Sequence, residues 1–150
     1  MMACGRAFRI LATVLLALSA AACSRPGSYE RFVTISQSSG GVYEFELDLS
    51  DTTSTYDISF YTRTLGGGQT NAPSLPLMVA WESPEGVLAL EEKVFMRAGG
   101  DRGRVEPYRS GVAMAEPGIW KISIRPAEVP EGFSGMGIIC KRNDGARQTP

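Results

Sequence analysis

Apolar and polar residues alternate with a period of two along most of the chain after residue 28. The clearest case is the segment 42–49, in which Tyr43, Phe45 and Leu47 are separated by acidic residues. Segments 56–63 and 119–125 show the same alternation. This period is typical of an antiparallel strand that buries one face and exposes the other.

Seven or eight short segments have strand character, and turn-forming residues separate them. We predict strands over 29–36, 42–49, 56–63, 77–82, 87–96, 112–115, 119–125 and 135–142. Segment 87–96 also contains fair helix formers, but it continues without a cap signal, so we interpret it as a strand. We expect loops over 65–75 and 98–110. The pattern predicts an all-β single domain over 29–142, an antiparallel β-sandwich with jelly-roll or Greek-key connections, followed by a flexible tail over 143–150.

The first 22 residues have the pattern of an export signal. Arg6 and Arg9 precede an apolar stretch from Ile10 to Ala22, which is shorter than the about 20 residues that span a bilayer. Small residues then lead into Cys23, which is the pattern of a lipobox with Cys23 as the lipid acceptor. The alternative is soluble secretion, because Ala20-Ala21-Ala22 also fits ordinary signal cleavage.

The cysteine count is consistent with lipidation. Cys4 would leave with the signal and Cys23 would carry lipid, so Cys140 would have no partner for an internal disulfide. Without lipidation, a disulfide between Cys23 and Cys140 would be possible. Cys140 lies in an apolar strand-like run, so we expect a small buried side chain there.

The residues after Cys23 predict where the folded domain lies. Ser24, in place of Asp, favours the outer membrane in bacterial sorting. Residues 23–28 then form a short tether, with a reach of about 15–20 Å. We therefore expect an outer-membrane lipoprotein, attached to the membrane through Cys23, whose domain stays close to the bilayer surface.

Composition excludes several classes of function. The chain has 150 residues, 15 basic and 16 acidic side chains, and no histidine. A slightly acidic chain is unlike nucleic-acid-binding proteins, which usually present a basic face. The lack of histidine excludes a Ser-His-Asp triad, a Cys-His pair and any histidine-containing zinc site. We predict no enzyme activity, no catalytic residues, no metal and no cofactor.

An arginine-rich segment is the best candidate for an interaction surface. Four arginines fall within thirteen residues, beside Asp101 and Glu106: Arg97, Arg102, Arg104 and Arg109. On a tethered domain such a loop can meet anionic lipid head groups or acidic polysaccharide. The alternative is a solvated loop that is balanced by its own acids.

Aromatic and acidic residues suggest weaker candidates. Tyr61 is out of phase with its apolar neighbours, so we expect it to be an exposed aromatic, whereas Trp81 and Trp120 are in phase and belong in the core. Glu44, Glu46 and Asp48 could supply a carboxylate pair for glycoside hydrolysis or ligands for calcium. Acids at alternate positions are equally typical of any solvated strand face. Gly66-Gly67-Gly68 lacks the ending of a phosphate-binding loop and suits a hairpin tip.

Short motifs in this order resemble the GldH family of gliding-motility lipoproteins from the Bacteroidetes. After the lipobox these motifs are Tyr29-Glu30, Phe45-Glu46-Leu47-Asp48 with Asp51-Thr52, Tyr56 to Arg63, Pro117 to Ile122, and Gly135-Met136-Gly137-Ile138. The resemblance implies a non-enzymatic, membrane-anchored lipoprotein that works with protein partners in a cell-envelope assembly. The alternative is a lipid-anchored carbohydrate-binding module, which would need coplanar exposed aromatics on one sheet face.

Overall fold

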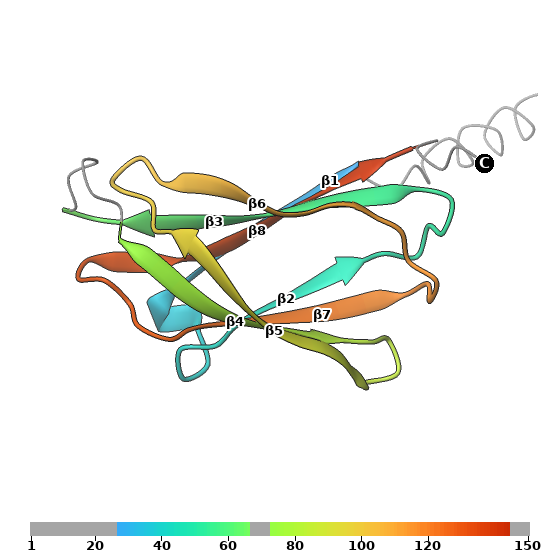
Figure 1. Cartoon of the computed structure of the whole chain (residues 1–150), viewed down its shortest axis with the longest axis horizontal. Coiled ribbons are helices and arrows are strands. Elements are labelled where there is room, and N and C mark those ends of the chain that lie inside the picture. Colours follow the sequence, from blue (N-terminus) through green and yellow to red (C-terminus); the bar gives the residue numbers. More distant parts are fainter. Residues whose placement is uncertain (1–26, 67–72, 145–150) are drawn as a thin grey trace, which may run out of the picture.

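The computed structural model describes residues 27–66 and 73–144, and most of them belong to strands (Figure 1). The elements are β1 (Ser28–Thr34), a short 3-10 turn η2 (Ile35–Gln37), β2 (Tyr43–Asp48), β3 (Thr55–Thr64), β4 (Ser74–Glu82), β5 (Leu88–Arg97), β6 (Arg104–Val112), β7 (Ile119–Pro126) and β8 (Phe133–Asn143). The predicted all-β class is confirmed, and segment 87–96 is a strand.

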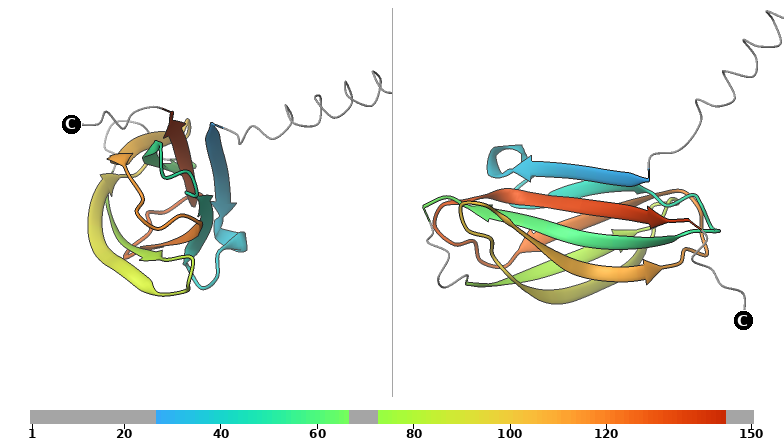
Figure 2. Two further views of the ribbon diagram at one scale, coloured as in Figure 1. Left: turned by 90° about the vertical axis from the view of Figure 1, so that its right-hand side faces the viewer. Right: turned by 90° about the horizontal axis from the view of Figure 1, so that it is seen from above.

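The strands form two antiparallel four-stranded sheets packed face to face (Figures 1 and 2). One sheet has the order β1-β8-β3-β6 and the other has the order β2-β7-β4-β5. Each strand of the first half therefore pairs with one of the second half, in the nested sequence β1–β8, β2–β7, β3–β6 and β4–β5. This nesting is that of a long hairpin rolled up into a sandwich, so the connections are those of a jelly roll.

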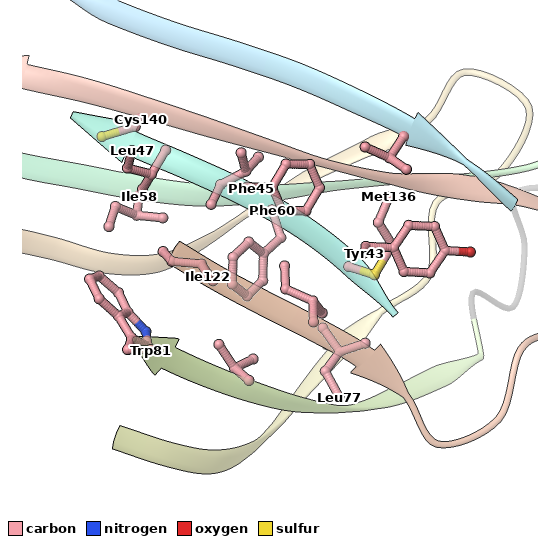
Figure 3. Close-up of a cluster of buried hydrophobic side chains, with 14 of the residues drawn as sticks. Tyr43, Phe45, Leu47, Ile58, Phe60, Leu77, Trp81, Ile122, Met136 and Cys140 are labelled. Atoms are coloured by element: carbon pink, nitrogen blue, oxygen red, sulfur yellow. The ribbon is translucent and has the colours of Figure 1, made fainter. Parts of the chain in front are cut away.

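The core lies between the two sheets and includes most of the side chains that the alternation predicted (Figure 3). Tyr43, Phe45 and Leu47 of β2 are buried, and the acidic residues between them are exposed. Trp81 and Trp120 are also buried, and their rings meet edge to face at 6.1 Å. Cys140 is a buried free thiol, as expected. Because strand side chains alternate between two faces, one apolar set per strand is enough to build this core.

The expected loop over 98–110 is wrong for most of its length, because Arg104–Val112 is strand β6. Charged residues and Pro107 obscured this strand in the sequence. β6 pairs only with β3, so it is the edge of its sheet, where proline and charge are tolerated and oppose unwanted pairing. The predicted strand over 112–115 is correspondingly wrong beyond Val112.

The predicted end of the first strand is also too late by two residues. β1 stops at Thr34, and Ile35–Gln37 form the 3-10 turn. The Gln37 side chain turns back to accept a 3.0 Å hydrogen bond from the Thr34 backbone N–H. This local side-chain bond competes with continued strand pairing.

The sandwich has two distinct ends. Ser28 begins β1 and pairs with Lys141, close to the end of β8, so both described termini lie at one end (Figure 2). We call this the N-terminal end; the β2–β3, β4–β5 and β6–β7 connections share it. The β1–β2, β5–β6 and β7–β8 connections lie at the far end.

Candidate functional site

The predicted lipid-attachment residue, Cys23, lies outside the described residues, as do Gly67 and Gly68 of the glycine run. The described part begins one residue before β1, so Cys23 precedes the first strand residue, Ser28, by five positions. Gly66 lies in the turn after β3. Across the described ranges, no helix has the length and apolar character needed to cross a bilayer.

The four arginines of the candidate interaction loop do not form one loop. Arg97 ends β5, Arg102 lies in the β5–β6 turn and Arg104 begins β6, so these three gather at the far end of the sandwich. Arg109 lies further along β6, toward the N-terminal end. Sequence proximity misled here because an extended strand advances about 3.3 Å per residue and carries Arg109 away.

Two of these arginines are balanced by acids of the same domain. Arg104 Nε lies 2.6 Å from Glu106 Oε1, and Arg109 Nη2 lies 2.7 Å from Glu92 Oε1. The other Glu106 oxygen accepts the backbone N–H of Arg97 at 3.2 Å. The Arg97 and Arg102 side chains are exposed, and within the described ranges neither pairs with an acid. They are therefore the cations of this group that remain available to a partner.

Arg109 belongs to a polar network that closes one side of the sandwich. Glu92 on β5 accepts hydrogen bonds from Arg109 and from the Tyr108 hydroxyl, both on β6. The Tyr108 hydroxyl also accepts a 2.9 Å bond from the Trp81 indole N–H. The Tyr108 bond lowers the pKa of Glu92, with Arg109 as a second cause, and burial raises the pKa of Tyr108. These contacts join the edges of the two sheets, so we assign Arg109 a structural role.

Tyr61 lies on the outer face of the β1-β8-β3-β6 sheet, as its phase predicted, but it is half-buried and not exposed as expected. It faces Phe32, with ring centroids 5.6 Å apart and planes at 73°. Gly137 lies between them in the register, and Val105 pairs with Tyr61 on the other side. Sequence reasoning missed Phe32, although its exposure follows from the burial of the neighbouring Val33.

The Phe32–Tyr61 pair is not a sugar-stacking platform of the expected kind. Such a platform needs two exposed rings in one plane, and these rings meet edge to face. Their edge-to-face arrangement is the one that aromatic pairs prefer when they pack on each other. The rings instead line an open groove of about 370 Å³ with Val105, Gly137 and Ile139.

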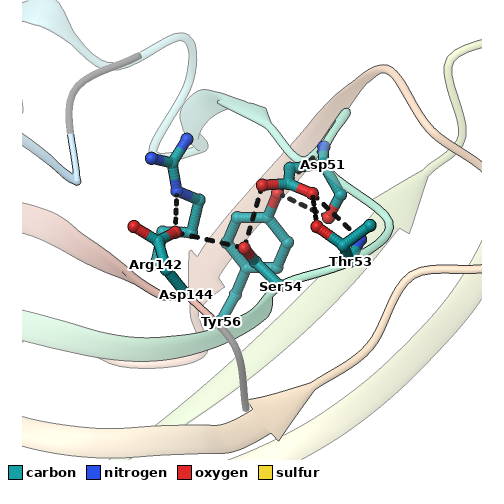
Figure 4. Close-up of polar contacts among 6 residues, drawn as sticks. All are labelled: Asp51, Thr53, Ser54, Tyr56, Arg142 and Asp144. Carbon is teal, nitrogen blue, oxygen red and sulfur yellow. Dashed lines mark hydrogen bonds and ion pairs between the residues drawn. The ribbon is translucent and has the colours of Figure 1, made fainter. Parts of the chain in front are cut away.

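The acidic candidates have ordinary structural roles. Glu44, Glu46 and Asp48 lie exposed on the outer face of the β2-β7-β4-β5 sheet, as in any solvated strand. Asp51 accepts hydrogen bonds from the Thr53 and Ser54 hydroxyls at 2.6 and 2.9 Å (Figure 4). These bonds, that of Thr53 first, lower the pKa of Asp51 to about 2. Within the described ranges, no three acidic, histidine or cysteine side chains converge as metal ligands would.

Tyr56 joins the same turn to the core. Its hydroxyl donates to the Asp51 carbonyl and accepts from the Asp51 backbone N–H, both at 3.1 Å (Figure 4). A tyrosine near a strand start that bonds back to the backbone a few residues upstream is a tyrosine corner. It secures the β2–β3 connection, where the chain crosses from one sheet to the other. This polar cluster is therefore explained by folding.

Comparisons with known proteins add no function. No protein-family model matches the chain, and no curated protein matches its sequence. Among solved structures, it resembles an arabinose-bound GH51 α-L-arabinofuranosidase (TM-score 0.40, 12% identity, 77% of this chain and 23% of that one). It also resembles a structure of infectious bursal disease virus Gx strain (0.37, 13%, 83% and 33%) and dimeric latent PorU from Porphyromonas gingivalis (0.29, 9%, 81% and 13%). The chain spans a third or less of each.

Proposed function

We propose that this protein is a membrane-anchored bacterial lipoprotein that acts without catalysis, as a component of a cell-envelope assembly. Its anchor is the lipid on Cys23, and its jelly-roll domain presents a surface to protein partners. The assembly is of the kind served by the gliding-motility lipoproteins that the sequence resembles.

One observation carries this proposal. Arg97, Arg102 and Arg104 meet at the far end of the sandwich, whereas the chain leads toward Cys23 from the opposite end. In the register of the sheet, Ser28 is aligned with Asp57 of β3, and Arg104 is aligned with Thr62 of β3. Ser28 and Arg104 are therefore offset by five residue positions along the strands. That offset is roughly 17 Å along the strands. A cationic surface placed away from the anchor suits an acidic protein partner.

The N-terminal end differs in charge from the far end. Its three connections carry Asp51, Glu85 and Glu116 and no basic residue. Like charges would oppose contact between that end and anionic lipid.

The test has two parts, both on the full-length protein in its own host. Mass spectrometry of the N-terminal peptide should find acylated Cys23, and Cys23→Ala should move the protein from the membrane to the soluble fraction. An unmodified Cys23 in a soluble protein would refute the anchor.

The second part addresses the partner. After mild cross-linking, the parent protein should co-purify with specific envelope proteins, and the double substitution Arg97→Glu and Arg102→Glu should reduce that recovery several-fold. Arg125→Glu is the matched control, because Arg125 is also exposed but lies on the outer face of the other sheet. Recovery of the protein alone, or with polysaccharide, would refute the assembly role.

A further inference from the structure

The outer face of the β1-β8-β3-β6 sheet carries an exposed apolar surface, which we call the Phe32 patch. It contains Phe32, Tyr61, Val105, Pro107, Gly137 and Ile139. Phe32 is 39% exposed and Val105 is 50% exposed. The patch draws on all four strands of the sheet, because Phe32, Gly137, Tyr61 and Val105 form one row of the register.

Glycines explain the hollow shape of the patch. A Cβ on Gly137 would lie 3.3 Å from Phe32 Cδ2 and 3.4 Å from Tyr61 Cβ, so the two rings flank a floor of bare backbone. The Tyr61 ring also rests on Gly103, where a Cβ would lie 2.0 Å from the hydroxyl oxygen. Aromatic side chains often cover the exposed backbone of a glycine in a sheet, which explains the presence of Phe32 and Tyr61 beside Gly137. It leaves the exposure of Val105 and Pro107 on β6 unexplained.

The outer face of the other sheet mixes charged and apolar side chains. Glu46, Lys121 and Glu82 form a row across the outer face of the β2-β7-β4-β5 sheet, with Lys121 Nζ 3.7 Å from Glu82 Oε1. The connections at the N-terminal end are acidic, as described above. Phe95 and Ile119 are also exposed on the outer face of that other sheet, but they lie on β5 and β7, which are not neighbours, whereas the Phe32 patch is built around one row of the register.

The length of chain between Cys23 and β1 restricts what the patch can meet. Ser28 follows Cys23 by five positions, which gives a reach of at most about 18 Å. β1 is an edge strand of the sheet that carries the patch, and Phe32 is four residues beyond Ser28. With acyl chains on Cys23 in the bilayer, a tether of this length lets this sheet face reach the head groups.

We propose that the Phe32 patch docks on the lipid bilayer, so that the β1-β8-β3-β6 sheet lies flat on the membrane. This inference rests on the lipid anchor of the proposed function. Aromatic and aliphatic side chains enter the boundary between head groups and acyl chains favourably. The anchor makes docking intramolecular, so a small patch is sufficient.

The charges around the patch indicate which lipid it suits. Arg31 lines the groove, Arg63 and Lys141 are on the same sheet face, and so are Glu30 and Asp57. These three cations and two anions nearly balance, which suits zwitterionic phosphatidylethanolamine rather than a strongly anionic surface. Docking in this orientation leaves the outer face of the other sheet, including Phe95 and Ile119, in water.

The test places a tryptophan reporter on each sheet face of the mature lipidated protein. Phe32→Trp reports on the patch, and Phe95→Trp is the control, because Phe95 is 66% exposed on the outer face of the opposite sheet. Both variants are reconstituted into phosphatidylethanolamine vesicles with or without brominated phosphatidylcholine. The emission of the parent, from the buried Trp81 and Trp120, is subtracted.

We expect bromine to quench the added emission of Phe32→Trp several-fold more strongly than that of Phe95→Trp. Equal quenching of the two reporters, or none of either, would overturn the proposal. This result would leave the lipid anchor of the proposed function intact, because acylation of Cys23 and membrane partition are measured on the same samples. Loss of acylation would instead refute the proposed function.

A second pair of variants covers the case in which tryptophan disturbs the sheet. Val105→Cys and Ile119→Cys carry a nitroxide label at positions that are each 50% exposed on opposite faces, while the native Cys140 is buried. We expect dissolved oxygen to relax the Val105 label more than an aqueous nickel complex does, and the reverse at Ile119. The same accessibility at both sites would refute docking. If a photo-cross-linker at Val105 in native envelopes captured a protein in place of lipid, the patch would be a protein interface and the proposal wrong.

Discussion

Removing one hydroxyl group, by Tyr56→Phe, should destabilise the whole domain. The Tyr56 side chain is 2% exposed, and its hydroxyl bonds to both the N–H and the C=O of Asp51 at 3.1 Å. The substitution keeps the ring and its packing. It leaves two backbone groups of the β2–β3 connection without their partner.

The magnitude follows from the environment of those groups. Leaving buried polar groups unsatisfied costs about 1–3 kcal/mol. Asp51 is half-buried, so water can reach the vacated groups in part, and we expect the lower part of that range, about 1–2 kcal/mol. The corresponding decrease in Tm is roughly 5–10 °C for a domain of this size.

Urea unfolding of the purified protein, followed by tryptophan fluorescence, measures this cost. The midpoint should fall while the slope stays the same, because the surface exposed on unfolding is unchanged. Tyr29→Phe is the control, since Tyr29 is half-buried against the same core and its hydroxyl has no hydrogen-bond partner within the described residues. If Tyr56→Phe cost no more than Tyr29→Phe, the tyrosine corner would not contribute to stability and our reasoning would be refuted.

Three further predictions test other parts of the structure. The Thr53 and Ser54 hydrogen bonds lower the pKa of Asp51 in the folded state to about 2. The ionised Asp51 carboxylate therefore stabilises the folded state fully above its unfolded pKa, near 4, and this stabilisation is lost as the pH falls toward 2. Asp51→Asn should flatten the decrease in unfolding free energy that is measured between pH 4 and pH 2, and an unchanged decrease would contradict this. Burial raises the pKa of the Cys140 thiol to about 11, so iodoacetamide at pH 8 should label it in denaturant but not in the native protein; rapid native labelling would show that the thiol is accessible. Phe45→Ala, at a fully buried position, should cost about 3–5 kcal/mol in urea unfolding, whereas Phe95→Ala on the surface should cost under about 0.5 kcal/mol, and similar costs would mean that the two sites are not in the environments described.

Local patterns predicted the core well. Tyr43, Phe45 and Leu47 were assigned to one face of a strand because each alternates with an acid, and all three are buried. The same reasoning placed Trp81 and Trp120 inside. These assignments depend only on the two-residue period of a strand, which any short segment displays without knowledge of its neighbours.

The interaction surfaces were predicted only in part. Tyr61 was recognised as out of phase, but its partner Phe32 is 29 positions earlier in the chain and meets it across β8. Arg104 and Arg109 were grouped in one loop, whereas β6 separates them and pairs them with Glu106 and Glu92. Proximity of this kind depends on which strands become neighbours.

The sequence by itself thus determined that the chain forms strands and which side of most strands is buried. The tertiary structure alone decided that β6 is a strand, that Phe32 and Tyr61 share a groove, and that Arg97 and Arg102 lie together at the far end of the sandwich. The physical reason is the range of the interactions involved. Alternation is a property of a few consecutive residues, while edge position, cross-strand pairs and the distribution of charge between the two ends arise from pairings between segments distant in the chain.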